Sequence, residues 1–237
     1  MDRHARALLA EAAGTFMFFF IGAGAIVAAV ASSSTDILPI ALAHGLALAV
    51  AVSAFGPLSG GHFNPAVTFG LAVAGKHPWS RLPTYWIAQL VGGVVAGYAL
   101  RYAFDFAPSA ADKTHLGTPG LGAGVGQPEA IVVEGLLTVF LLWAVFGTAV
   151  SPLAPRIAGF GIGLTVAADI LVGGPITGAS MNPARWFGPA VASGFYDNAL
   201  VYWIGPLIGA ALAGLSYRYV FAPAEDRAPA RPAAPKA

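Results

Sequence analysis

Long apolar stretches alternate with short polar ones along nearly the whole chain. Six stretches are apolar over about 20 residues, enough for a helix to cross the ~30 Å hydrocarbon core of a bilayer. They are roughly residues 7–30, 37–56, 83–104, 128–150, 157–174 and 200–221. The first follows basic residues, as in a signal peptide, but it is too long for one, and we interpret it as a retained span. The pattern predicts an all-α membrane protein with six transmembrane helices.

Two polar segments interrupt this pattern, "SGGHFNPAVTFG" (59–70) and "TGASMNPARWFG" (177–188). Both contain Asn-Pro-Ala, at Asn64, Pro65 and Ala66 and at Asn182, Pro183 and Ala184. Asn is a preferred helix N-cap, and Pro suits the first helical position because its missing N–H would be unpaired there. Helices over 64–75 and 182–192 would have about 11 residues and be roughly 16 Å long. We therefore predict two re-entrant half-helices, each spanning half the membrane.

The chain also contains an internal repeat. "EAAGT" (11–15) matches "EGLLT" (134–138), and "YWIAQLVGG" (85–93) matches "YWIGPLIGA" (202–210). With the Asn-Pro-Ala segments, three matched pairs occur in the same order in both halves. Each half has three spans, an odd number, so the second copy must be inverted relative to the first.

The repeats define one channel domain over residues 1–222, with inverted copies at about 7–104 and 128–221. The segment 223–237 is rich in Ala, Pro and charge, and we expect a disordered tail.

Basic residues predict the orientation, because Lys and Arg concentrate on the cytoplasmic side of membrane proteins. Six spans put both termini on one side. Assigning the termini and the loops 75–82 and 151–156 to the cytoplasm places nine of the twelve Lys and Arg residues there. We expect a multi-pass protein of a cell membrane with both termini cytoplasmic.

Composition narrows the classes of function. With 57% hydrophobic and 10% charged residues, the chain is too apolar for a soluble domain. Its net charge of +1 gives no basic field for nucleic acid. There is no cysteine, and we find neither a nucleophile–base pair nor a metal-ligand pattern. We therefore expect no enzyme activity and no cofactor.

The glycine-rich segments before the half-helices, 56–63 and 173–181, cannot be helical throughout. Lipid does not tolerate unpaired carbonyls, so these segments must line a cavity or be buried in protein. We expect a ladder of acceptors for a file of water, from the carbonyls of Gly60, Gly61, His62, Gly178 and Ser180.

Two further features would act on solutes in such a cavity. Asn64 and Asn182 have side-chain N–H groups that could donate to the same water. The half-helix N-termini would meet at the midplane, each carrying about +0.5 charge, and would repel cations.

The two segments "SGGHFNPAVTFG" and "GASMNPARWFGPAV" resemble those of the aquaporin family, and the resemblance extends over residues 7–221. "ALAHGLALAVAVS" (41–53) and "VYWIGPLIGAALAGL" (201–215) are most similar to the plant tonoplast intrinsic proteins. The resemblance implies an aquaporin-like fold that conducts water and small neutral solutes. It also implies a homotetramer in the bilayer, with one pore per subunit.

The family narrows its pore at four positions, which fall here on His44, Ile170, Ala179 and Arg185. A guanidinium there would repel cations and donate to solute oxygens; the alternative is an arginine that pairs with an acid. His44 could instead be a satisfied core residue. Small Ala179 and apolar Ile170 imply a filter wider than one for water alone, and the resemblance adds ammonia to the expected solutes.

Several other polar residues are open at this point. Asp169, where the resembled subgroup has Asn, could accept from backbone N–H groups or support His44 or the outer loop. His115 could lie near the filter. Glu11 and Glu134 are expected to accept hydrogen bonds from the re-entrant segments, and His62 to line the pore or pack in its loop.

Other classes of membrane protein remain alternatives. A secondary transporter also uses inverted repeats and broken helices, but it needs a coupling site where this chain offers two neutral Asn residues. An adhesive protein would have larger extramembrane loops. Within the channel class, a glycerol or metalloid facilitator is the main alternative, favoured by "MNPARWFGP" and disfavoured by His44 in place of a large aromatic residue.

Overall fold

The computed structural model describes residues 1–155 and 157–223, so the expected tail lies almost wholly outside the described residues. Within those ranges the chain is helical and has no strands. The long helices are α1 (Arg3–Ala31), α2 (Ile37–Ser59), α4 (Leu82–Ala103), α6 (Gln127–Val145), α7 (Ala158–Thr177) and α9 (Ala199–Ser216). The short ones are α3 (Pro65–Val73), α5 (Pro108–Lys113) and α8 (Pro183–Ser193).

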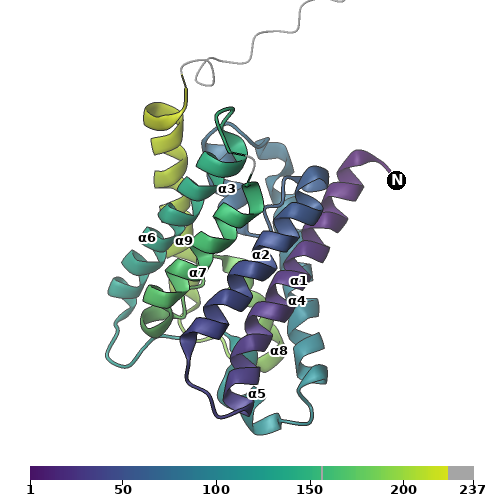
Figure 1. Ribbon diagram of the computed structural model, residues 1–237, viewed down its shortest axis with the longest axis vertical. Helices are drawn as coiled ribbons and strands as arrows, with labels where there is room; N and C mark the ends of the chain where they lie inside the picture. Colours follow the sequence, from purple (N-terminus) through teal and green to yellow (C-terminus); the bar gives the residue numbers. More distant parts are fainter. Residues whose placement is uncertain (156, 224–237) are drawn as a thin grey trace, which may run out of the picture.

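The six long helices correspond to the six apolar stretches. Five are long and apolar enough to cross a membrane by length and composition, with α6 and α9 each counted together with the turn that follows. The sixth, α4, has 22 residues but includes polar side chains such as Gln89 and Arg101. All six run in one bundle, and both ends of the described chain lie at its upper end (Figure 1). This arrangement agrees with six crossings.

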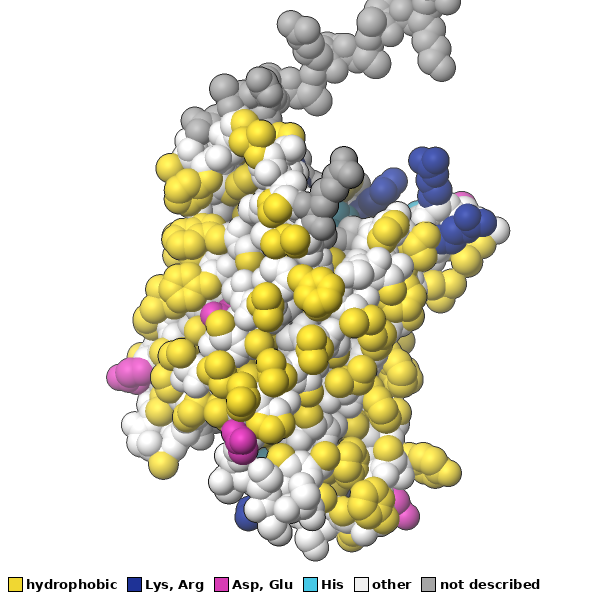
Figure 2. Space-filling model, viewed as in Figure 1, with side chains coloured by type: hydrophobic (Ala, Val, Ile, Leu, Met, Phe, Trp, Pro, Cys, Tyr) yellow, Lys and Arg dark blue, Asp and Glu magenta, His cyan; other side chains and the backbone are white. Residues whose placement is uncertain are grey.

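The surface is divided as a bilayer requires. Apolar side chains cover the flank of the bundle, while most Lys and Arg side chains on the face shown gather at the upper end (Figure 2). Exposed apolar residues include Leu46 and Val50 on α2 and Leu164 on α7. Such residues are stable in contact with lipid or another subunit.

The two halves of the bundle pack closely through α2 and α7. A Cβ on Gly45 would lie 2.5 Å from the carbonyl oxygen of Gly163, and one on Gly163 would lie 2.2 Å from that of Gly45. A side chain at either position would therefore push the helices apart. The two glycines let one helix of each repeat run backbone to backbone with its counterpart.

The segments before the half-helices differ in part from the sequence-based expectation. We expected the preceding helices to end at 56 and 174, but α2 continues through Pro57 to Ser59, and α7 through Pro175 to Thr177. Gly60 and Gly178 end them in the left-handed conformation, with φ of 98° and 79°. A proline is tolerated there, and the irregular backbone shortens to 60–63 and 178–181.

Candidate functional site

Each half-helix begins at the predicted Asn-Pro pair. The Oδ1 of Asn64 accepts from the backbone N of Ala66 at 2.8 Å and of Val67 at 3.4 Å. Asn182 caps α8 in the same way, accepting from Ala184 at 3.0 Å and Arg185 at 3.3 Å. The capping satisfies N–H groups that the start of a helix leaves unpaired.

The same asparagines join the two halves. The Nδ2 of Asn64 donates to the carbonyl of Met181 at 2.8 Å, and that of Asn182 donates to the carbonyl of Phe63 at 3.0 Å. We expected these amides to be free for solute. Instead each uses one of its two N–H groups to hold the opposite re-entrant segment, which leaves one for the cavity.

Glu11 holds the first re-entrant segment. It is fully buried, and its oxygens accept from the Ser59 hydroxyl at 2.6 Å, the His62 and Phe63 backbone N at 3.0 and 2.7 Å, and Gln89 Nε2 at 2.7 Å. All four partners are donors, the pattern that suits an ionised carboxylate.

Glu134 does the same in the second half. Its oxygens accept from the Thr177 hydroxyl at 2.7 Å and from the backbone N of Ser180 and Met181 at 2.8 and 2.6 Å. The two acids therefore lie where the inverted repeat placed them, each fixing the irregular backbone of its own half.

Sequence reasoning missed two tyrosines that complete this arrangement. The Tyr85 hydroxyl donates to the carbonyl of Ser59, and the Tyr202 hydroxyl donates to that of Thr177, both at 2.8 Å. They bind the last carbonyls of α2 and α7, which a helix end leaves unpaired. The signal was present, since both tyrosines begin the repeated "YWI" motif.

A cavity runs between the two halves, past both half-helix N-termini. One part of its wall is apolar and comes from the long helices: Phe18, Leu48, Leu141, Val145, Ile162, Val166 and Ile170. The other part is polar or from the re-entrant segments: His44, Gly61, His62, Asn64, Ala179, Ser180, Met181, Asn182 and Arg185. Water in this cavity can hydrogen-bond along one side only.

Two of the expected carbonyl positions lie elsewhere. Gly60 and Gly178 are not among the residues that line this cavity. Both serve as left-handed ends of the preceding helices. Gly178 lines a second cavity at the outer mouth, which shares His44 and Ile170 with the first. In the first half, the residues expected to provide the carbonyl ladder therefore begin at Gly61, not at Gly60.

The structure brings all four residues proposed from the sequence as the outer constriction to the wall of this cavity. His44 Nδ1 lies 2.8 Å from the Ile40 carbonyl, which accepts a hydrogen bond from it. His44 Nε2 then accepts from Arg185 Nε at 3.3 Å and Nη2 at 3.2 Å. These contacts require a neutral imidazole with its proton on Nδ1.

The remaining guanidinium nitrogen is held by the outer loop. Arg185 Nη1 donates to the Gly117 carbonyl at 2.8 Å. Within the described parts of the chain, Arg185 forms no ion pair with an acid, so its charge faces the cavity uncompensated at contact distance. Ile170 and Ala179, 5% and 4% exposed, add apolar surface to the same cavity wall.

Asp169 and His115 do not take the positions considered for them. Asp169 is 6% exposed, and its Oδ2 has no hydrogen-bond partner among the residues described, neither a backbone N–H nor His44. His115 stacks on Phe195 with ring centroids 3.9 Å apart. It lines a separate cavity with Arg101 and Asp112, and the same loop contacts Arg185 through the Gly117 carbonyl.

Comparisons with known proteins show the family of this chain. Residues 2–217 match the family model described as major intrinsic protein. Aquaporin TIP2-1 of Arabidopsis thaliana is 44% identical over 233 residues, which cover 94% of this chain and 90% of the relative. Probable aquaporin TIP2-2 of Oryza sativa subsp. japonica is 44% identical over 225 residues, 91% of this chain and 87% of the relative.

A solved structure matches the fold. The aquaglyceroporin from Plasmodium falciparum superposes with a TM-score of 0.81, covering 92% of this chain and 97% of its own, at 24% sequence identity. At that identity the likeness shows the fold alone. The family match and the plant relatives show more: this chain belongs to the major intrinsic protein family and is an aquaporin-type membrane channel.

Proposed function

We propose that the channel conducts water and ammonia and excludes protons and cations. The observation that carries this proposal is the constriction of His44, Ile170, Ala179 and Arg185 around one cavity. It offers the donor groups of one guanidinium against apolar surface. A small neutral solute with a lone pair can accept from Arg185 while the rest of it contacts Ile170 and Ala179.

The side chains beside Arg185 set the solute size. A small residue at 179 and an imidazole at 44 leave more width than bulky aromatic residues would. Ammonia needs one donor from the pore for its lone pair and little else, so this wall suits it. A glycerol-type facilitator is the alternative within the family, and we disfavour it because His44 stands where a large aromatic residue would be expected.

Exclusion of cations follows from two positive features in the same file. Arg185 carries a fixed charge at the constriction, and the N-termini of α3 and α8 meet at Asn64 and Asn182, each adding about half a positive charge. These positive charges repel cations but not neutral molecules, so the same wall lets ammonia pass and opposes ammonium and protons.

We further propose a homotetramer of pores in a cell membrane, with both termini cytoplasmic. The apolar flanks of α2 and α7 supply surface for neighbouring subunits, and the basic residues at the end that holds both termini support the orientation. Site-directed labelling of single cysteines introduced near Asp2 and near Asp112 in intact cells tests the orientation, because only the outer position should react.

Stopped-flow measurements on proteoliposomes test the transport proposal. Light scattering after an osmotic step reports water flux, and an internal pH dye reports ammonia entry from an ammonium gradient. We expect both signals to be faster than in protein-free vesicles, while an imposed proton gradient without ammonium decays at the empty-vesicle rate. Ammonia entry no faster than in empty vesicles would refute the ammonia claim.

A further inference from the structure

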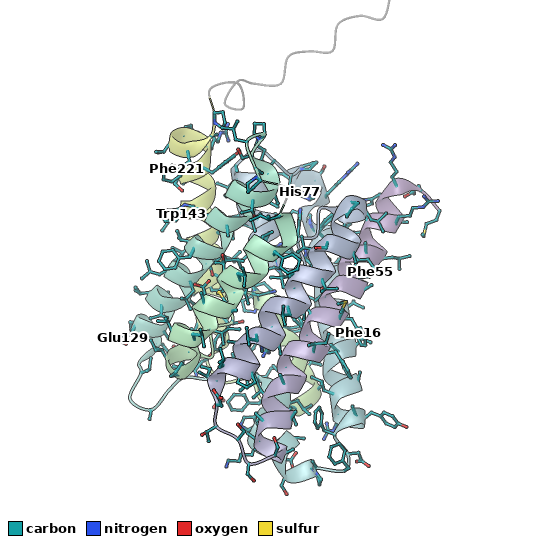
Figure 3. The ribbon with its side chains drawn as sticks, viewed as in Figure 1. Phe16, Phe55, His77, Glu129, Trp143 and Phe221 are labelled. Carbon is teal, nitrogen blue, oxygen red and sulfur yellow. The ribbon has the colours of Figure 1, made fainter. Side chains whose placement is uncertain are left out.

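Two histidines, fifteen residues apart in the sequence, lie side by side near one end of the pore. His62 lies in the first re-entrant segment and His77 in the turn after α3, at the upper end of the molecule (Figure 3). Their ring centroids are 5.0 Å apart, and they lie 5.1 and 4.6 Å from the ring of Tyr85. His62 and His77 are 8% and 9% exposed. This pair belongs to no part of the filter described above.

The nitrogens of the pair are incompletely used. His62 Nδ1 lies 3.1 Å from the Thr68 hydroxyl, which leaves Nε2 without a hydrogen bond to the described residues. His77 Nε2 is buried and has no hydrogen-bond partner in the described part of the chain. A buried nitrogen of this kind is costly unless a ligand or water completes it.

The spacing of the rings fits one tetrahedral metal ion. Zinc binds imidazole nitrogen at about 2.0–2.1 Å, and the ring centre lies roughly 1 Å beyond, so two imidazoles on one ion have centres about 5 Å apart. For one ion to bind both rings, the unused Nε2 atoms must face a common point between them. The described residues contain no group of three or more metal-ligating side chains, so water would fill the other positions.

Charges of both signs act on the pair: Glu11 favours a cation there, whereas Arg81 opposes one. The Glu11 carboxylate, with donors on both oxygens, accepts directly from the His62 backbone N at 3.0 Å. It offsets the positive end of α3, which begins after Asn64. Because His62 lines the cavity itself, an ion bound by the pair would stand in the path of the water file.

We propose that His62 and His77 form an inhibitory site for zinc or a similar divalent transition-metal ion at the pore end opposite the filter. The blocking consequence rests on the proposed water conduction, whereas binding does not. Two protein ligands and water make an exchangeable site, so the block is reversible by a chelator.

The experiment compares wild type with His77→Phe, which keeps a ring against Tyr85 but removes both nitrogens. Zinc chloride is titrated into purified protein by calorimetry and into proteoliposomes before an osmotic step. We expect water flux in wild type to fall and to recover with EDTA, and the zinc concentration for half-inhibition to rise by more than about tenfold in His77→Phe. His115→Phe, which removes a histidine outside the pore, should behave as wild type.

Two results would overturn the proposal. One is zinc binding and inhibition that are equal in wild type and His77→Phe; the other is no zinc binding to wild type by calorimetry. If wild type conducts no water, calorimetry still decides the site, because loss of binding in His77→Phe supports it independently of flux. Melting temperatures of the variants, compared with wild type, show that each is folded.

Discussion

His44 and Arg185 hold each other in one arrangement at the constriction. The imidazole Nδ1–H donates a hydrogen bond to the Ile40 carbonyl at 2.8 Å, and Nε2 accepts from two guanidinium N–H groups at 3.3 and 3.2 Å. Gly117 holds the third guanidinium nitrogen at 2.8 Å. The long, flexible Arg185 side chain is thereby fixed in the cavity wall. A selective filter needs such preorganisation.

The buried acids are predicted to stabilise the re-entrant segments. In Glu134→Gln one carboxylate oxygen becomes an NH₂ group facing donors from Thr177, Ser180 or Met181, so at least one buried donor loses its acceptor. We expect the free energy of unfolding to fall by about 1–3 kcal/mol.

A thermal unfolding series in detergent measures this effect. Glu129→Gln is the matched control, because Glu129 is exposed at the start of α6. Equal melting temperatures for Glu134→Gln and the control would contradict the assigned role. The corresponding Glu11→Gln change should likewise lower the melting temperature, because Glu11 holds the first re-entrant segment.

Asp169→Asn is predicted to raise stability without lowering water flux. The Asp169 Oδ2 is buried without a partner, and a neutral amide costs less to bury than a carboxyl group that can ionise. A gain of about 1 kcal/mol would raise the melting temperature by roughly 2–4 °C. Exposed Asp105→Asn serves as control. A lower melting temperature for Asp169→Asn would contradict this prediction, because it would mean that the carboxylate stabilises the fold.

His77 is predicted to make stability depend on pH. Burial, with a smaller effect from neighbouring His62, lowers the pKa of His77 to about 4, whereas an unfolded histidine has an ordinary pKa of about 6.5. Between pH 6.5 and 4, His77 is protonated in the unfolded state but neutral in the folded state. The free energy of unfolding therefore falls as the pH drops from about 6.5 to 4 and then levels off.

Unfolding of wild type and His77→Phe across this pH range measures that contribution. The wild type should lose more stability on acidification than the variant. If the free energy of unfolding depended on pH equally in both proteins, the contribution of His77 would be ruled out, because the two proteins share all other titratable groups.

Much of the fold was predictable because a membrane imposes few solutions. Apolar length alone indicated the six spans, and Asn64-Pro65 and Asn182-Pro183 set the starts of α3 and α8 to the residue. The ends of α2 and α7 were predicted too early, because the glycine-rich segments 56–63 and 173–181 suggested a break from their first residues. The helices instead continue to Ser59 and Thr177 and end at the left-handed Gly60 and Gly178.

The site was predictable only where the chain repeats itself. Glu11 and Glu134 stood out as matched acids on apolar helices, but Ser59 and Thr177 are small polar residues of an ordinary kind, and their role depends on contacts over 48 and 43 residues. The meeting of His62 with His77 and the separation of His115 from the filter are tertiary facts that no local spacing encodes.

The most direct test of the account is paired water and ammonia flux in proteoliposomes of wild type and His44→Phe. Phenylalanine cannot accept from Arg185 and fills more of the constriction. We predict that wild type conducts both solutes and that the variant loses most ammonia flux while retaining water flux. Ammonia flux that is unchanged in the variant, or absent from a wild type that conducts water, would contradict the assignment of His44 and Arg185 as the solute filter.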